Sequence, residues 1–400
     1  MKRILVAFDK FKDSIAARPA CDLAQEVIRQ SRPDVQVEKA PLTDGGEGFA
    51  EILTREAGGE LRTAQVCGPR LQPVLASYGI VSADRVPEGV LRRFSIPDSG
   101  TIAIVEMAQA AGLELLEDRD RDPFLTTTRG VGEVLGIAAS QQVDAILMGV
   151  GGSATHDLGI GALTALGLEI RTRDEPEFDR GPRIPPHGAL PGEWPDVRSL
   201  ACDKVANLPR LFIACDVDNP LLGRRGAAAV FARQKGMAEA DFPSLEKETQ
   251  RMAQKLCRCF RQDVSLMDEP GSGAAGGIAF GFRAAFGADR VAGFPLVADW
   301  LKLDAKIEAA DLVVTGEGCF DESSLSGKGA GSLLRKAVER KKPVLLLAGR
   351  HSLDTEKLKE LEEQGVTVVA VSPPDLELSK ALKQAPERLR AALRHSLEGM

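Results

Sequence analysis

The sequence predicts an α/β fold with two α/β domains, one discontinuous and carrying the other as an insertion. The 400-residue chain is too long for a single core of ordinary size. Both ends of the chain alternate strand patterns with helical periods, which is typical of a parallel sheet with helices on both faces. The middle begins with short strand-like pieces that interrupt this alternation. We therefore expect residues 1–62 and 292–400 to form a Rossmann-like domain, with residues 63–291 inserted into it.

The N-terminal segment has the pattern strand, helix, strand, helix. Each strand is a short apolar run, and the first helical period stops near Pro33, which cannot continue a helix. The second strand leads into a loop of glycines and acids, TDGGEG. The expected strands are 2–8 and 35–40, and the expected helices are 18–30 and 48–57.

The middle segment mixes strands with helices. Strand-like pieces at 61–81 are separated by prolines, and the proline-rich stretch 174–195 is interpreted as an exposed excursion or linker. A threonine triplet precedes the helical period 126–140 and is expected to cap it. We expect further strands at 101–107, 145–148 and 211–215, and further helices ending at 166 and covering 244–260 and 281–286.

From Asp311 onward the alternation is regular. Short apolar runs alternate with amphipathic periods at the spacing of parallel βαβ units. The expected strands are 311–316, 343–348 and 366–371, and the expected helices are 333–340, 356–364 and 379–398.

The amino-acid composition indicates which classes of binding partner this protein is expected to have. Net charge is −7, no block of lysine or arginine stands out, and aromatic residues make up only 4% of the chain. Nucleic-acid and membrane-surface proteins need basic patches, so we expect neither partner. The seven cysteines lack the spacing of a disulfide framework or a zinc site, and no apolar run is long enough to cross a bilayer. These features favour a cytoplasmic protein with small-molecule ligands and leave a homodimer open.

The most informative stretch is 144–161, DAILMGVGGSATHDLGIG. A short apolar strand is followed by three glycines, a serine and a threonine. A strand that ends in a glycine-rich turn before a helix often binds phosphate, because backbone N–H groups and the helix N-terminus favour an anion. Glycines and carboxylates are combined again at 43–48, 214–223 and 315–329. We expect the four loops to come together.

Seven acids are expected at the carboxyl ends of strands or one turn beyond, where open parallel sheets bind ligands. A single acid of this kind is usually a helix cap or a turn residue. Seven together would repel one another and need a cation, and Mg²⁺ binds one or two carboxylates together with phosphate oxygens. Another carboxylate could accept the proton of a substrate hydroxyl, as in phosphoryl transfer. The acids are Asp44, Glu47, Asp157, Asp216, Asp218, Glu317 and Asp321.

Cations would be needed to neutralise nucleotide phosphates or an acidic substrate. Lys10 and Lys12 lie in the first loop, Lys235 lies in RQKG, and Lys328 lies in SGKG. A surface lysine is usually only solvated, but Lys328 stands between a serine-rich loop and a helix. The serines of that loop could contact phosphate or cap the helix.

Other motifs are weaker. Gly327-Lys328 lacks the additional glycine and the following Ser or Thr of a P-loop. A GxGxxG match that begins at Gly271 follows a polar, proline-ended segment rather than a strand. The turn Gly149-x-Gly151-x-x-Ala154 does follow a strand, so an NAD(P)-dependent oxidoreductase is an alternative function. Against it stands HDLGIG, a poor sequence for the helix that the dinucleotide motif requires.

The chain resembles the type 1 glycerate kinase family along its whole length. The resemblance implies two α/β domains, one inserted in the other, with ATP and glycerate in the cleft between them. It also implies a 2-phosphoglycerate product in most members. The matching segments are FDKFKDSIAA (8–17), PLTDGGEG (41–48), TIAIVEMAQAAGL (101–113), TTTRGVGEVL (126–135), GVGGSATHDLGIGALTALG (149–167), ACDVDNPLLGRRGAAAVFARQKG (214–236), PGSGAAGGIAFG (270–281), DLVVTGEGCFDESSLSGKG (311–329) and PVLLLAG (343–349).

Some loop residues differ from the family pattern. A serine and a glycine of the family's first motif are Lys10 and Asp13 here. The asparagine and glycine that flank the acid of its glycine-rich motif are His156 and Leu158, and an arginine is Cys319. These differences keep a second alternative open, a non-catalytic paralogue that binds a hydroxy acid or a nucleotide.

We interpret the chain as an ATP- and Mg²⁺-dependent kinase that acts on the hydroxyl of a small hydroxy acid, with D-glycerate as the preferred candidate. Carboxylates would share the metal and base roles. The expected catalytic acids are Asp44, Asp157, Asp218, Glu317 and Asp321, and the expected metal ligands among them are Asp157, Asp218 and Glu317. The expected substrate- and nucleotide-binding residues are Lys10, Lys12, Gly45, Gly46, Gly151, Gly152, Ser153, Asn219, Lys235, Ser324 and Lys328.

Overall fold

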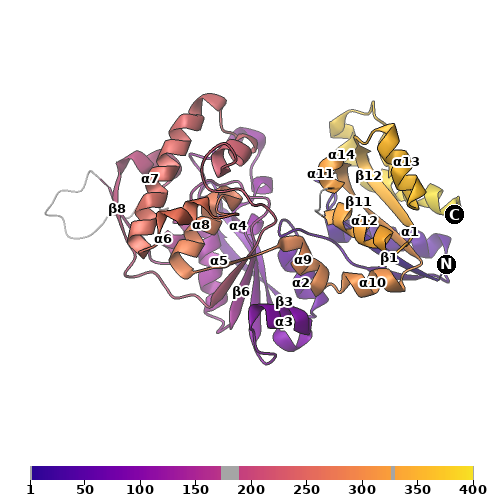
Figure 1. Ribbon diagram of the computed structural model, residues 1–400, viewed down its shortest axis with the longest axis horizontal. Coiled ribbons are helices and arrows are strands. Elements are labelled where there is room, and N and C mark those ends of the chain that lie inside the picture. Colours follow the sequence, from indigo (N-terminus) through magenta and orange to yellow (C-terminus); the bar gives the residue numbers. More distant parts are fainter. Residues whose placement is uncertain (1, 173–188, 326–328, 400) are drawn as a thin grey trace. The chain divides into compact units, whose positions relative to one another are not determined.

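The computed structural model describes residues 2–172, 189–325 and 329–399. The chain forms two compact units, each with its own sheet (Figure 1). Unit 1 combines Met1–Asp44 with Phe294–Met400, and unit 2 consists of Gly45–Gly293. The predicted α/β class is confirmed, and so is the insertion of one α/β unit into a discontinuous one.

Unit 1 contains a five-stranded parallel sheet in the order β13-β12-β11-β1-β2. The central pair joins the two ends of the chain, because β1 lies directly beside β11. Alternate residues of β1 face opposite sides of the sheet, and both sets are buried, so helices cover both faces. The strands are β1 (Arg3–Phe8), β2 (Gln36–Lys39), β11 (Leu312–Phe320), β12 (Val344–His351) and β13 (Val366–Ala370).

The helices of unit 1 bury apolar stripes on this sheet. On one face, the first and last helices of the chain pack together and against the central strands, as Ala24, Ile28, Leu389 and Leu393 are all fully buried. The helices are α1 (Ala17–Ser31), α9 (Gly293–Trp300), α10 (Leu303–Ala309), α11 (Glu322–Leu325), α12 (Gly329–Glu339), α13 (Thr355–Glu363) and α14 (Leu378–Glu398).

Unit 2 contains a six-stranded mixed sheet in the order β10-β9-β6-β5-β4-β3. The first four strands of this order are parallel, and β4 and β3 are antiparallel to their neighbours. A separate antiparallel hairpin is formed by β7 and β8. The strands are β3 (Glu60–Cys67), β4 (Pro73–Ser82), β5 (Thr101–Glu106), β6 (Ala145–Gly149), β7 (Glu169–Thr172), β8 (Val197–Ala201), β9 (Arg210–Ala214) and β10 (Asp289–Val291).

The helices of unit 2 enclose a core that includes Trp194, Phe280 and Phe282. Trp194 belongs to a short 3₁₀ turn, Pro191–Asp196, and is fully buried. The end of the predicted exposed excursion at 174–195 is therefore part of the core, while 173–188 lie outside the described residues. The helices are α2 (Phe49–Glu56), α3 (Glu88–Phe94), α4 (Ala108–Ala111), α5 (Arg129–Ala139), α6 (Ile160–Ala165), α7 (Phe242–Phe260) and α8 (Ala274–Phe286).

Several elements differ from their predicted bounds. β11 continues to Phe320 because it pairs with β12 as far as His351, so Glu317 lies inside a strand and not in a loop. Helix α5 begins only at Arg129, and the Thr128 side chain does not cap it. The Thr128 hydroxyl binds Asp157 instead.

The first junction between the units lies at Asp44/Gly45. Residues 45–62 belong to unit 2 because α2 packs on β4 and β5 and because β3 pairs with β4 over its whole length.

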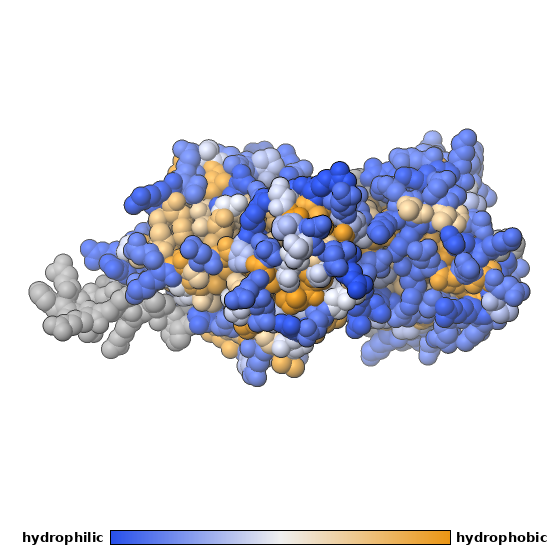
Figure 2. Space-filling model, turned by 90° about the horizontal axis from the view of Figure 1, so that it is seen from below, coloured by the Kyte–Doolittle hydropathy of each residue, from blue (hydrophilic) through white to orange (hydrophobic). Residues whose placement is uncertain are grey.

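On the face drawn in Figure 2, hydrophilic residues predominate and apolar residues form patches among them. None of the described helices is long and apolar enough to cross a membrane.

Candidate functional site

Four acids lie at the carboxyl edge of the unit 1 sheet. Asp9 directly follows β1, Asp44 lies in the loop after β2, Glu317 is in β11, and Asp321 follows that strand. Burial, with the charges of Asp44 and Glu317, raises the pKa of Asp9 to about 7. The amide N–H of Lys10 donates to Asp9 Oδ1 at 2.7 Å and opposes this rise. The structure therefore groups three predicted acids and adds Asp9.

The pKa of Glu317 is raised for the same reasons as that of Asp9. Burial raises the pKa of Glu317 to about 7, and the charges of Asp321 and Asp44 add to the rise. A hydrogen bond from the Ser324 hydroxyl opposes it. The Oε1 atom of Glu317 is buried and has no hydrogen-bond partner among the described residues. Buried acceptors without donors are rare, and this one is available to a positively charged ligand.

The acid cluster fits a hard divalent cation that is bound mainly by other ligands. Within the described ranges, no three His, Cys, Asp or Glu side chains form a group that could hold a metal ion. Mg²⁺ commonly binds one or two carboxylates and completes its six ligands with water and phosphate oxygens. The unpaired Glu317 Oε1 and the raised pKa values of Asp9 and Glu317 suit that limited role.

The loops around this cluster lie so close together that glycine is needed at the points of contact. A Cβ atom on Gly329 would lie 2.0 Å from Asp9 Oδ2, and its φ of +45° also favours glycine, so α12 can begin against Asp9 only at this residue type. A Cβ on Gly318 would lie 3.0 Å from the amide N of Lys12. The Lys12 side chain is exposed beside this contact, and Lys328 lies outside the described residues.

Asp321 and Ser324 form a reciprocal pair at the start of α11. The amide N–H of Ser324 donates to Asp321 Oδ1 at 3.1 Å, and the amide N–H of Asp321 donates to Ser324 Oγ at 3.3 Å. This arrangement is a helix-capping pair. Ser324 also donates to Glu317, so it links the cap to the acid cluster.

In unit 2 the segment 45–47 packs against the turn after β6, and these belong to two of the four loops that were predicted to come together. The amide N–H of Gly151 donates to the Gly45 carbonyl at 2.9 Å. A Cβ on Gly151 would lie 2.5 Å from Gly46 Cα, and a Cβ on Gly152, whose φ is +70°, would lie 2.2 Å from Glu47 Oε1. The close approach of the turn after β6 to Gly46 therefore requires glycine at position 151, and the positive φ of Gly152 favours glycine there.

The turn that follows β6 presents open donors above a buried lysine. Neither the amide N–H of Gly152 nor that of Ser153 takes part in a hydrogen bond within the described part of the chain. Lys235 Nζ donates to Ser153 Oγ at 2.8 Å and to the Thr155 carbonyl at 2.6 Å. Lys235 is only 1% exposed, so it supports the turn from inside the protein.

Asp157 is buried and saturated with hydrogen bonds. Its Oδ2 accepts from the amide N–H and the hydroxyl of Thr128, both at 2.8 Å, and from the Gly161 amide at 3.2 Å. Its Oδ1 accepts from the Gly159 amide at 3.1 Å. Burial raises the pKa of Asp157, and these donors oppose the rise. The carboxylate thus joins the start of α5 to the glycine loop, and four donors already contact it.

His156, beside Asp157, is also fully buried. The Thr249 hydroxyl donates to the Leu245 carbonyl at 2.7 Å, so it accepts from His156 Nε2–H at 3.0 Å. Burial, and then the charge of Lys235, lowers the pKa of His156 to about 3. The imidazole is therefore neutral and connects the loop to α7.

The loop after β9 is held by its neighbours. Asp216 Oδ1 accepts from the Gly293 amide at 2.7 Å, and the Asn219 side chain donates to the Arg225 carbonyl at 2.7 Å. Asp218 is exposed and forms an ion pair with Arg290 at 2.6 Å. Of the two predicted residues, Asp218 is thus paired with a residue of β10, and Asn219 is bonded within the loop itself.

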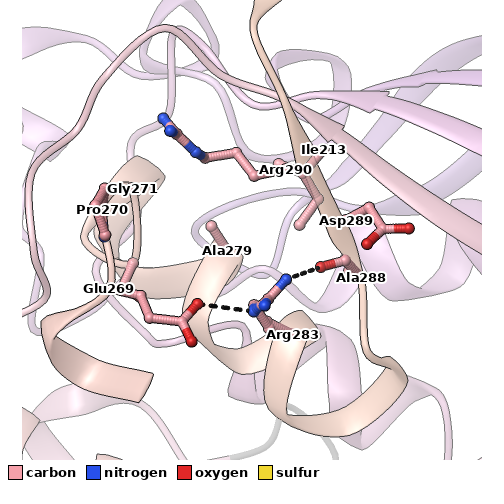
Figure 3. A pocket seen from close by; sticks show the side chains of 10 residues that line it. Ile213, Glu269, Pro270, Gly271, Ala279, Arg283, Ala288, Asp289 and Arg290 are labelled. Atoms are coloured by element: carbon pink, nitrogen blue, oxygen red, sulfur yellow. Dashed lines mark hydrogen bonds and ion pairs between the residues drawn. The ribbon is translucent and has the colours of Figure 1, made fainter. Parts of the chain in front are cut away.

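A pocket of about 190 Å³ lies beside this loop, at the β10 edge (Figure 3). Its charged lining comes mainly from Glu269, Arg283 and Arg290. Arg283 pairs with Glu269 at 2.9 Å, and Arg290 pairs with Asp218, so both guanidinium groups are already neutralised. The pocket does not include the glycine turn after β6.

Asp9 and Thr128 are the residues that sequence reasoning missed. Asp9 could have been predicted from the sequence. It is a carboxylate directly after a strand, and the other acids were chosen by that criterion. Thr128 stands in the quoted segment TTTRG, but its partner Asp157 is 29 residues away, and only the fold brings them together.

The dinucleotide motif is not formed at the predicted turn. After β6 ends at Gly149, the chain does not enter a helix until α6 begins at Ile160. Gly152, Leu158 and Gly159 have positive φ values in between, whereas the Rossmann turn leads directly into a helix. The Gly271 match follows a 3₁₀ turn, Val264–Asp268, and no strand.

Comparison with known proteins gives a consistent result. Residues 4–398 match the Glycerate kinase family. The chain is 34% identical to a glycerate 2-kinase of Escherichia coli K12 over 92% of this chain and 89% of the relative. It is 32% identical to a glycerate kinase of Bacillus cereus over 97% and 95% of the two chains. A crystal structure of a protein proposed to be glycerate kinase 2 from Salmonella typhimurium LT2 matches with a TM-score of 0.72 and 32% identity, covering 100% of this chain and 98% of the other.

Proposed function

Since the chain belongs to the glycerate kinase family, we propose that it transfers the terminal phosphoryl group of ATP to a hydroxyl of D-glycerate and forms 2-phosphoglycerate. Membership of this family makes the chain a kinase that acts on glycerate. ATP as the donor, Mg²⁺ as the cation, the 2-phospho product and a cytoplasmic location are the proposed additions. The seven free cysteines support a reducing compartment.

The observation that carries the proposed chemistry is the acid cluster of unit 1. Phosphoryl transfer needs a base near neutral pKa for the substrate hydroxyl and a cation for the phosphate charge. Asp9 and Glu317 have pKa values of about 7. Glu317 Oε1 also lacks a partner among the described side chains. The cluster therefore offers a candidate base and candidate ligands for a cation in one place.

We assign the residues of unit 1 as follows. Glu317, with Asp44, would hold Mg²⁺, which when bound neutralises the charge of the nucleotide phosphates. Asp9 is the preferred base, because its pKa of about 7 allows it to accept a hydroxyl proton at neutral pH. Asp321 and Ser324 keep the loop after β11 in position through their capping pair. Lys10, Lys12 and Lys328 are proposed to contact phosphate.

Unit 2 is proposed to bind an anion at the turn after β6. The open N–H groups of Gly152 and Ser153 are suitable donors for a carboxylate or a phosphate. Gly45, Gly46 and Gly151 shape this turn by their close packing. Asp157, Asp218 and Asn219 are assigned to loop positioning, because each is already engaged by neighbouring groups.

An assay with ATP, Mg²⁺ and D-glycerate tests the function. We expect ADP release to depend on all three, and NMR of the product to show phosphate on C2. The oxidoreductase alternative predicts instead that NADH fluorescence changes on titration with the protein. A non-catalytic paralogue predicts that D-glycerate or ATP raises the melting temperature without any turnover. Absence of ADP release with D-glycerate and other small hydroxy acids would reject the kinase proposal.

The cation site makes a separate pH-dependent prediction. The pKa of Glu317 rises from 4.5 to about 7 on folding, so this group destabilises the fold progressively as pH increases from 4.5 to 7. A bound cation would remove that repulsion, and below pH 7 it must displace protons. We expect MgCl₂ to raise the melting temperature more at pH 8 than at pH 6. Equal shifts at both pH values, or an unchanged pH 8 shift in Glu317→Gln, would contradict this site.

A further inference from the structure

The polar cluster beneath the turn after β6 has features that the assignments above leave unexplained. It consists of Ser153, Thr155, His156 and Lys235, which are all buried. Lys235 ends a helical segment formed by Ala228–Ala232 and Arg233–Lys235. Its ammonium group donates to Ser153 and to Thr155, which lie 82 and 80 residues away in the sequence. The cluster is thus a tertiary support for the turn.

The charge of Lys235 is only partly compensated. Its two hydrogen-bond acceptors are neutral, a hydroxyl and a carbonyl. Burial lowers the pKa of Lys235 to about 7, and the charge of Asp157 raises it. His156 is neutral, and Arg121, whose backbone packs on Gly236, pairs its guanidinium with Asp118. Asp157 is therefore the acid that acts on this ammonium group in the free protein.

Several polar groups of the cluster have no partner. Thr155 Oγ1 and His156 Nδ1 are buried and make no hydrogen bond among the described residues. The N–H groups of Gly152 and Ser153 are likewise open on the described part of the chain. Donors at the turn and a positive charge behind it favour an anion, because preorganised dipoles in a buried site interact strongly with charge.

We propose that Lys235 is a positioning residue for an anionic ligand bound at the turn after β6. It acts through Ser153 and Thr155, which it keeps in place, and it supplies the positive charge that stabilises the anion. The inference rests on the proposed function, because the anion is either the carboxylate of the hydroxy acid or the polyphosphate of the nucleotide.

The proposal has a definite pH signature. An anion at the turn stabilises the charged form of Lys235 and so raises its pKa. Below pH 7 the lysine is charged with or without the ligand, and affinity is at its maximum. Above pH 7 the free protein must take up a proton on binding, so affinity falls about tenfold per pH unit. The decline continues until pH passes the pKa of the complex.

The experiment measures KM for D-glycerate and KM for ATP from pH 6 to 9. We expect one of the two KM values to rise about tenfold between pH 7.5 and 8.5 in the natural protein. Lys235→Arg should keep a low KM over the whole range, since arginine stays charged. Lys235→Met should raise that KM about tenfold or more already at pH 6.5, without a pH slope and with a smaller change in kcat. Lys247→Met, an exposed lysine on α7, is the matched control.

The outcomes distinguish a bound carboxylate from a bound polyphosphate. They also distinguish failure of the Lys235 proposal from failure of the proposed kinase function. A slope in KM for D-glycerate identifies the carboxylate, and a slope in KM for ATP identifies the polyphosphate. Flat KM profiles in the natural protein, or a slope that persists in Lys235→Met, would overturn the role of Lys235. If Lys235→Met does not fold, the natural protein and Lys235→Arg decide. If no phosphorylation occurs at all, the proposed function fails, and calorimetric titration with D-glycerate and with ATP at pH 6.5 and 8.5 still tests Lys235.

Discussion

Replacing Glu317 by glutamine is expected to lower kcat by about 10²–10³, because the cation that Glu317 would hold, and that would stabilise the transition-state charge, would be bound less well. The substitution keeps the shape of the side chain and removes the negative charge beside Asp9, Asp44 and Asp321. Burial and repulsion already oppose that charge, since the pKa of Glu317 is raised to about 7. The neutral side chain should therefore leave the fold at least as stable at pH 8. A steady-state assay and a melting curve at pH 8 measure the two effects.

The matched control is Glu308→Gln, an exposed acid on α10 in the same unit. It should leave both kcat and the melting temperature near their original values. A kcat within about threefold of the original in Glu317→Gln would contradict the assignment of this residue, given the loss expected for a transition-state partner. A large drop in melting temperature would mean that Glu317 is a structural residue, because relief of repulsion predicts the opposite sign.

Much of the fold was predictable because its signals are local. β1, β6 and the first part of β11 consist mostly of apolar residues, as expected of parallel strands buried on both faces. The regular alternation after Asp311 predicted β12 and β13. The hairpin of β7 and β8 was missed because its strands, EIRT and VRSLA, are short and half polar. Such strands exist through pairing with each other and have no pattern of their own.

The candidate site was less predictable because its roles depend on distant partners. An acid followed by glycines looks the same in sequence whether it faces a ligand or a buried threonine. Asp157 is the second kind, and its partner Thr128 precedes it by 29 residues. Lys235 was predicted to bind substrate or nucleotide, but nothing in the segment RQKG indicates that it is buried against Ser153, 82 residues away.

Two differences from the family pattern have a visible physical consequence. Asp13 and Leu158 occupy positions where the family has glycine, and their φ values are +59° and +57°. Residues with a side chain adopt this region at a cost of about 1–2 kcal/mol. Leu158 is fully buried in the core of unit 2, so packing of its side chain can offset that cost. Both positions therefore have a backbone conformation that favours glycine, although neither residue is glycine.

Replacing Asp157 by asparagine is expected to destabilise the protein as well as reduce its activity. Three donors converge on Oδ2, from the Thr128 amide, the Thr128 hydroxyl and the Gly161 amide. An amide NH₂ placed at Oδ2 cannot accept any of them, and an amide oxygen placed there puts the NH₂ group against the Gly159 N–H. A buried donor left without an acceptor costs about 1–3 kcal/mol. We therefore expect a melting temperature lower by about 4–8 °C for a loss near 2 kcal/mol.

The activity of Asp157→Asn should fall because the turn after β6 is no longer held in place. The cause of this loss distinguishes a positioning role of Asp157 from a metal-binding role. Loss of the Asp157 charge also lowers the pKa of Lys235, because that charge raises it in the natural protein. The KM of the ligand that binds at the turn, either D-glycerate or ATP, should then begin to rise at a lower pH. The dependence of the rate on Mg²⁺ should stay unchanged. Asp268→Asn, at an exposed position of unit 2, should alter none of these quantities. An unchanged melting temperature combined with a much weaker response to Mg²⁺ would instead return Asp157 to the metal site, since a saturated structural carboxylate cannot produce that combination.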